Sequence, residues 1–216
     1  MSNSPDLRSE WLGRISYEAG LEMQDAAVKA RLAGETTDTV YLLEHEPVYT
    51  IGRTRDKSSL KGDDNALPHP VFETNRGGQA TYHGPGQLVG YPILDLKSYG
   101  KDLHTYLRAI EDALVAACAE IGVEAATREG LTGVWCEDRK VASIGVGVRH
   151  WVSMHGFAIN VGADLSGFDS IVPCGIGGVQ MSSVSREAGR DIGVREFAEV
   201  AFASLADVLA KLATAP

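Results

Sequence analysis

The chain has 216 residues, of which 44% are hydrophobic and 23% are charged, so its composition indicates a folded globular protein rather than a disordered or fibrous one. The formal net charge of −9 argues against a broad surface for nucleic acid or anionic membranes. No run approaches the roughly 18 apolar residues that cross a bilayer, and the N-terminal MSNSPDLRSE lacks the apolar core of a signal peptide, so we expect a cytoplasmic protein.

Apolar residues recur at helical spacing over residues 17–33, and Gly34 follows as a stop signal, so the first predicted element is an amphipathic helix. Three short runs rich in β-branched and aromatic residues come next, each bounded by Gly, Pro or Asp. They predict strands at residues 39–45, 47–52 and 71–75.

Two further helices are predicted in the second half of the chain. Residues 102–121 keep the helical period cleanly, and Gly122 stands at a natural C-cap position. Residues 194–212 show the same period near the C-terminus. Cys118 lies beside the apolar face of the earlier helix, so we interpret it as a packing residue.

Strands rich in Val and Ile are predicted between these two helices, at residues 133–137, 140–148 and 153–161. Residues 162–190 are irregular, and long loops in compact domains are often functional. Strands and helices are interspersed without regular alternation, so we expect an α+β (mixed α/β) fold, a mixed β-sheet flanked by helices in one domain over residues 1–216.

The three cysteines are an odd number without CxxC spacing, which argues against a disulfide framework or a cysteine-rich zinc site. A site assembled from Cys174, His83 and His155 has neither an HExxH motif nor close Cys/His spacing to support it, so we expect no metal. Cys136 lies in the sequence VWCE, which we interpret as part of a buried strand.

The densest chemical signal is RGGQATYHGPGQLVGYPILDL at residues 76–96, where five glycines and two prolines surround Arg76 and His83. Glycine lets backbone amides approach a ligand without an intervening Cβ, and such amides can receive a carbonyl oxygen or an anion. A ligand-binding loop and a structural cluster of turns both fit this composition.

This segment resembles the signature of the lipoyl(octanoyl) transferase family, and further motifs match that family in order over about residues 36–190. Those motifs are LLEHEPVYTIGR at 42–53, REGLTGVW at 128–135, KVASIGVGV at 140–148, MHGFAINV at 154–161 and IVPCGI at 171–176. The resemblance implies the fold of the biotin and lipoate protein ligase catalytic domain.

The resemblance also implies a cysteine and lysine pair, which the motifs place at Cys174 and Lys140. It implies a substrate-binding lining that consists of Arg76, Gly77, Gly78, Gln79, Ala80, Thr81, Tyr82, His83, Ser143, Ile144, Gly145, Gly156, Phe157 and Ala158. His83 would polarise the substrate carbonyl or hold the acyl group, whereas His45 and His155 fit a structural or a functional role equally.

The implied reaction moves an octanoyl group from octanoyl-acyl carrier protein, through a thioester on Cys174, to a lysine of a lipoyl domain. The implied acceptors are the apo lipoyl domains of 2-oxoacid dehydrogenase E2 subunits and the glycine cleavage H protein. A thiolate attacks a thioester far better than a thiol does, and Lys140 would serve first as acid and then as base. The donor is already activated, so we expect no cofactor, and the chain has no nucleotide-binding GxxxxGK[ST] motif.

Two alternatives remain at the level of sequence. An ATP-dependent lipoate or biotin protein ligase of the same fold would be expected to show an HDxGN-like or GRGRxGR-like motif, and neither is present. A non-catalytic module that binds acyl carriers would not need both Cys174 and Lys140. The basic stretch at 53–61, in an otherwise acidic chain, is either a solvated loop or a docking patch for an acidic partner.

Overall fold

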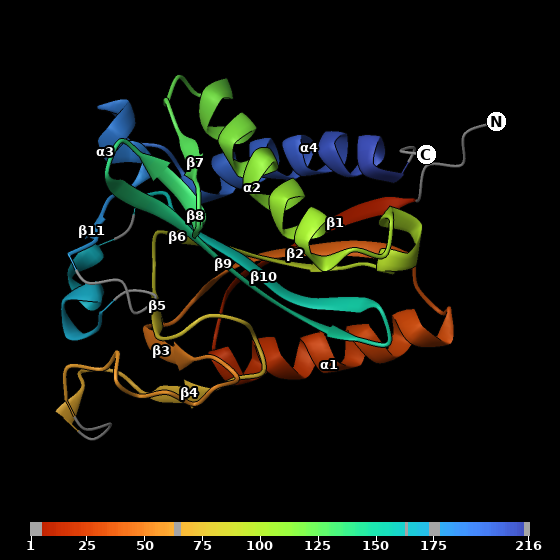
Figure 1. Cartoon of the computed structure of the whole chain (residues 1–216), viewed down its shortest axis with the longest axis horizontal. Coiled ribbons are helices and arrows are strands. Elements are labelled where there is room, and N and C mark those ends of the chain that lie inside the picture. The colour runs from red at the N-terminus through yellow and green to blue at the C-terminus, as the bar shows by residue number, and fades with distance from the viewer. Residues whose placement is uncertain (1–5, 63–65, 163, 173–177, 214–216) are drawn as a thin grey trace.

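The computed structural model describes residues 6–62, 66–162, 164–172 and 178–213. Within them a large sheet carries helices on both faces, and a small sheet lies beside one end (Figure 1). The elements are β1 (Leu7–Ile15), α1 (Tyr17–Ala33), β2 (Asp38–His45), β3 (Val48–Ile51), β4 (Val71–Glu73), β5 (Thr81–His83), β6 (Gln87–Ile93), the 3-10 helix η2 (Leu96–Tyr99), α2 (Leu103–Glu120), β7 (Ala126–Arg128), β8 (Leu131–Cys136), β9 (Arg139–Arg149), β10 (Val152–Asn160), the 3-10 helix η3 (Leu165–Ser170), β11 (Gln180–Met181), α3 (Val184–Ala188) and α4 (Val194–Ala213).

The large sheet has the strand order β1-β2-β6-β10-β9-β8-β7, with β11 beside β9. The pairs β1–β2 and β11–β9 are parallel, and the other pairs of this sheet are antiparallel. The small sheet has the order β4-β3-β5. The predicted α+β architecture with a mixed sheet is therefore confirmed.

The helices cover opposite faces of the large sheet: α2 and α4 pack together on one face and α1 on the other (Figure 1). The main core lies under α2 and α4 and includes Ile110, Leu114 and Phe197. All three predicted long helices are present, and each lies within a residue or two of its predicted bounds. The N-terminus of α2 is capped by Asp102, whose carboxylate accepts from the backbone of His104 at 2.8 Å.

The central strand β6 runs through the glycine-rich segment, where the sequence indicated only a loop. Pro92 has no N–H for the ladder, and the pairing of β10 with β6 ends before it, at Phe157↔Gly90. His155 takes a φ of +57°, and its N–H donates to Gln24 Oε1 at 2.7 Å. A Cβ on Gly156 would lie 2.5 Å from Pro92 Cδ, so a glycine is required there. The regular pairing of β6 with β10 therefore ends beside the candidate site.

Residues 162–190, predicted to be irregular, contain the short elements η3, β11 and α3. β11 has two residues and α3 has five, which is too short for periodicity to reveal them. In the described ranges, no helix has both the length and the apolar character that a bilayer span requires.

Candidate active site

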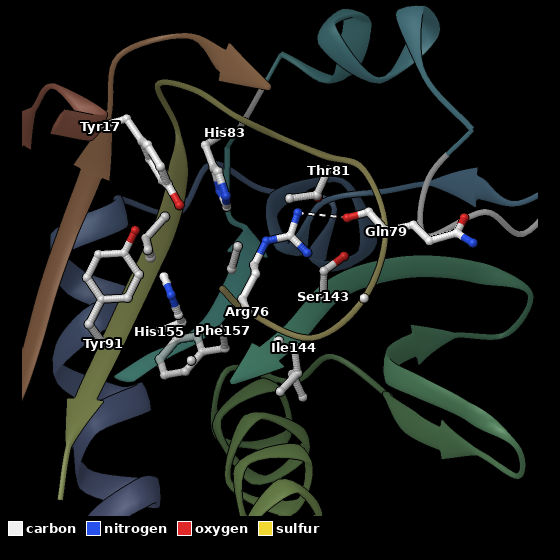
Figure 2. Close-up of a pocket in the computed structure, with 15 residues that line it drawn as sticks. Tyr17, Arg76, Gln79, Thr81, His83, Tyr91, Ser143, Ile144, His155 and Phe157 are labelled. Carbon is white, nitrogen blue, oxygen red and sulfur yellow. Dashed lines mark hydrogen bonds between the residues drawn. The ribbon is translucent and has the colours of Figure 1, made fainter. Parts of the chain in front are cut away.

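A cavity opens between the glycine-rich loop, the strands β6, β9 and β10, and the start of α1 (Figure 2). It holds about 480 Å³ of space free of protein atoms, open solvent at its mouth included. The lining residues are Tyr17, Arg76, Gly78, Gln79, Thr81, His83, Val89, Tyr91, Ser143, Ile144, Gly145, His155, Gly156, Phe157 and Ala158.

The cavity brings together nearly all of the residues that the sequence suggested for substrate binding, from the glycine-rich segment and from the adjacent strands β9 and β10. Among those residues, Gly77, Ala80 and Tyr82 do not line it. Tyr17 and Tyr91 do line it and were missed, because one begins a helix that looked purely structural and the other lies in an unrecognised strand.

Arg76 holds the glycine-rich loop in shape from within the site. Its guanidinium donates to Thr50 O at 2.7 Å, to Gln79 O at 2.8 Å and to its neighbour's carbonyl, Gly77 O, at 2.9 Å. The side chain crosses the cavity in Figure 2 and is buried. Arg76 therefore places a cation at the cavity wall while it fixes the surrounding backbone.

Two glycines allow backbone to pack directly on backbone around this loop. A Cβ on Gly52 would lie 1.8 Å from Gly78 O, and one on Gly145 would lie 2.7 Å from Gly77 O. Side chains at either position would displace the loop. Glycine at these two positions, outside the glycine-rich segment, therefore lets the carbonyls of Gly77 and Gly78 pack against neighbouring backbone.

Three buried histidines gather at the end of the cavity near α1. His83 and His155 line it, whereas His45 lies behind Tyr91, with its Nε2 2.7 Å from the tyrosine hydroxyl. Burial lowers the pKa of His45 to about 4, that of His83 to about 3 and that of His155 to about 4. All three rings are therefore neutral at pH 7 and suit an uncharged ligand. Among the residues that the structure describes, no three His, Cys, Asp or Glu side chains converge as metal ligands would.

Because these histidines are buried in the neutral form, we expect the free energy of unfolding to fall in acid. Between about pH 6.5 and pH 4 the unfolded chain binds protons that the folded chain excludes, so the free energy of unfolding should fall as the pH falls. His155→Asn, which suits the φ of +57°, should flatten this slope by up to about 1.4 kcal/mol per pH unit. Urea unfolding at several pH values measures the slope, with exposed His104→Asn as control; equal slopes in the two variants would contradict the prediction.

Lys140 is buried in β9, with 1% of its surface exposed. Its Nζ donates to Thr132 O at 3.0 Å and lies 5.2 Å from the ring centre of Trp135. The β8–β9 register shifts between Val134 and Trp135, and this bulge interrupts the alternation of β9 beside Lys140. Lys140 does not line the cavity, whereas Ser143, three positions along the same strand, does.

Cys174, the expected nucleophile, lies outside the described residues, as does the rest of the segment 173–177. The described chain on both sides of this segment is anchored near the candidate site. On one side, Val172 N–H donates to Ser59 O at 2.7 Å. On the other side, β11 pairs with β9 at Lys140.

The other two cysteines, Cys118 and Cys136, are buried, and their thiols are poor nucleophiles. Burial raises the pKa of the Cys118 thiol to about 12 and that of the Cys136 thiol to about 11. Both thiols are therefore protonated at neutral pH. This agrees with their interpretation as packing residues.

The basic stretch 53–61 connects the glycine-rich loop with the chain that leads to residue 172. Arg53 N–H donates to Arg76 O at 3.0 Å, and Lys61 N–H donates to Ser170 O at 3.0 Å. The stretch is therefore built into the rim of the candidate site.

Comparison with known proteins finds octanoyltransferases among the relatives of this chain. A model of the lipoyl protein ligase A/B catalytic domain matches residues 16–206. An octanoyltransferase from Geobacter sulfurreducens is 50% identical over 188 residues, which cover 86% of this chain and 77% of the relative.

Solved structures of related fold are more distant in sequence. A bi-partite lipoate protein ligase from Thermoplasma acidophilum, described with its E2 lipoyl domain, superposes with a TM-score of 0.69 at 15% identity, over 94% of this chain and 84% of that one. A biotin protein ligase from Aquifex aeolicus superposes with a TM-score of 0.56 at 13% identity, over 95% and 70% of the two chains. These likenesses confirm the expected ligase-like fold.

Proposed function

Because this chain belongs to the lipoyl protein ligase A/B catalytic-domain family, with octanoyltransferases as its relatives, we propose that it transfers an octanoyl group to lipoyl domains during protein lipoylation. The finer part of the proposal is that the donor is octanoyl-acyl carrier protein and that the acyl group passes through a thioester on Cys174. Neither step needs a cofactor.

The cavity supports an uncharged acyl chain as the substrate. Its walls include the apolar side chains of Val89, Ile144 and Phe157, and its histidines are neutral at pH 7. Burial of an eight-carbon acyl chain contributes up to about 5 kcal/mol, at roughly 0.8 kcal/mol per methylene. A chain in this cavity would direct its carbonyl along β9, from Ser143 toward Lys140.

The observation that carries the mechanism is the position of Lys140, buried in β9 beside β11, with Cys174 six residues before β11. Six residues span at most about 20 Å when fully extended. The connection therefore permits a close approach of Cys174 to Lys140. We assign the nucleophile and the acid–base group on this basis together with the matching motifs.

The first half-reaction starts from a Cys174 thiolate and a Lys140 ammonium. The thiolate attacks the donor carbonyl, the new thioester forms, and the carrier thiol leaves with the proton of Lys140. For free side chains in water, reference pKa values near 8.5 and 10.4 favour such a charged pair over the neutral pair by about 2 units. In the protein, Thr132 O accepts a hydrogen bond from Lys140 Nζ.

The second half-reaction starts from the acylated Cys174 and neutral Lys140. The amine of the incoming lysine attacks the thioester, its proton passes to Lys140, and Cys174 leaves as a thiolate. The products are an amide and the starting charged pair, so the cycle closes without nucleotide. The proposed acceptors are the apo lipoyl domains of 2-oxoacid dehydrogenase E2 subunits and the glycine cleavage H protein.

The alternative function is that of an ATP-dependent ligase, since lipoate and biotin protein ligases share this fold. A reaction of purified protein, octanoyl carrier protein and an apo lipoyl domain separates the two. We expect octanoylated domain without ATP or magnesium, through an intermediate that hydroxylamine cleaves, and no product from free octanoate with ATP. Product from octanoate and ATP alone would establish the ligase instead.

The basic stretch is proposed to dock the carrier protein, a typically acidic partner. Arg55 and Lys57 are exposed, and both form ion pairs with Glu73. Arg55 Nε lies 3.3 Å and Lys57 Nζ lies 3.9 Å from its carboxylate oxygens. Changing both cations to Glu should raise the apparent KM for the carrier and flatten its salt dependence, but leave attack on a small octanoyl thioester unchanged. The matched control reverses Lys29 and Lys97, which also pair with carboxylates. Equal effects on both donors would rule out docking here.

A further inference from the structure

Glu111 is a buried carboxylate in α2, and the proposed reaction has no direct use for it. None of its surface is exposed. Its ion-pair partner within the described ranges, Arg108, keeps 55% of its own side chain in solvent. Burial of a carboxylate is costly by several kcal/mol unless hydrogen bonds and charges compensate it, so its other contacts are informative.

The second carboxylate oxygen of Glu111 binds the peptide group between Thr132 and Gly133. Glu111 Oε1 accepts from Gly133 N–H at 2.8 Å, and the carbonyl of the same peptide, Thr132 O, accepts from Lys140 Nζ at 3.0 Å. The carboxylate and the ammonium thus lie at opposite ends of one amide dipole. A negative charge at the N–H end increases the electron density on the carbonyl oxygen, which strengthens its bond to an ammonium.

The backbone conformation at Gly133 requires a glycine beside the Lys140 side chain. Its φ is +134°, and a Cβ there would lie 2.6 Å from Lys140 Cε. Gly133 also lies where β7 and β8 lose register, between the pairs Ala126↔Trp135 and Arg128↔Leu131. A side chain reaching in from α2 therefore supplies the acceptor for this N–H.

Two other ionisable groups lie on the strands around Lys140, namely Arg139 and Cys136. Arg139, the preceding residue in β9, pairs with Glu187 of α3 at 2.8 Å and 2.9 Å. The Cys136 thiol in β8 has its pKa raised to about 11 by burial. Among the described residues, Glu111 is the carboxylate connected to the ammonium through a single peptide.

Given the role proposed above for Lys140, we propose that Glu111 is a positioning residue, which fixes and polarises the Thr132–Gly133 peptide so that its carbonyl holds the Lys140 ammonium. Glu111 does not touch substrate. Its contribution is to keep Nζ in one place and to favour its charged form, on which the Cys174 thiolate depends.

The test is Glu111→Gln, which keeps the shape and an acceptor for Gly133 but removes the charge. We expect kcat at pH 7 to fall about tenfold, as for other groups that orient a catalytic residue, and KM for the carrier to stay unchanged. The pH profile of Cys174 alkylation should shift to higher pH, because the thiolate loses support from the ammonium. Ile110→Val, on the same helix, controls for lost stability. A pH profile and kcat that match those of Ile110→Val would show that Glu111 is structural only.

A double variant separates this inference from the proposed function. In Lys140→Met, the further change Glu111→Gln should have no additional effect on alkylation. If Lys140→Met itself leaves alkylation and turnover unchanged, the acid–base role proposed for Lys140 fails. If Lys140→Met slows both and Glu111→Gln does not, the positioning role of Glu111 alone fails.

One measurement avoids any change at Glu111, in case that variant does not fold. The amide proton of Gly133 should shift in its NMR spectrum when Lys140→Met removes the ammonium from the far end of the peptide. Asp112→Asn, on the exposed side of α2, should leave it unmoved. An unshifted Gly133 amide in Lys140→Met would overturn the coupling.

Discussion

Cys174→Ala is expected to abolish octanoyl transfer, by a factor of at least about 10⁴, and to abolish the acyl adduct seen by intact mass after incubation with octanoyl carrier protein. The loss is this large because the proposed route has no second nucleophile. An alanine leaves the donor thioester to direct attack by a lysine amine, which is mostly protonated at neutral pH.

The other cysteines provide matched controls for this result. Cys118→Ala and Cys136→Ala should keep both transfer and adduct, because burial raises the thiol pKa to about 12 and about 11 and leaves almost no thiolate at neutral pH. An acyl adduct that persists in Cys174→Ala, or that disappears in Cys136→Ala, would assign the nucleophile elsewhere.

The helices α2 and α4 were predictable because each buries one largely apolar stripe over four or more turns, a period that few other structures produce. The pattern of α1 is weaker, since its buried face includes Gly20 and Gln24. The edge strand β1 was not predictable. Its sequence LRSEWLGRI lies mostly half-exposed against β2, without a clean alternation of apolar and polar residues. β6 was hidden by Gly90 and Pro92, which a central strand tolerates here because Phe157 fills the space above Gly90 and the pairing with β10 ends at Gly90, before Pro92.

The candidate site was predictable to the extent that its residues lie in recognisable motifs. The glycine-rich segment and the motifs in β9 and β10 meet in one cavity, as the resemblance implied. Tyr17 and Glu111 could not be found in this way, because each lies in a helix whose pattern accounts for it as an ordinary helical residue. Only the packing of α1 and α2 against the sheet brings these two side chains to the site.

Lys140→Met tests the acid–base group, and the substitution is mild because methionine replaces the buried stem of the lysine with similar volume. Loss of the ammonium removes the charge that favours the Cys174 thiolate, so labelling of Cys174 by iodoacetamide at pH 7 should slow by about tenfold or more. Octanoyl transfer should fall further, because both half-reactions lose their proton donor or acceptor.

The pH dependence of labelling distinguishes this role of Lys140 from a structural one. Near pH 10 the thiol is ionised with or without a neighbouring cation, so the labelling rates of wild type and Lys140→Met should converge there. A variant with a distorted site would instead remain slow at every pH. Equal labelling and equal turnover at pH 7 would mean that Lys140, with its bond to Thr132 O and its place over Trp135, serves only to fill the space between β8 and β9.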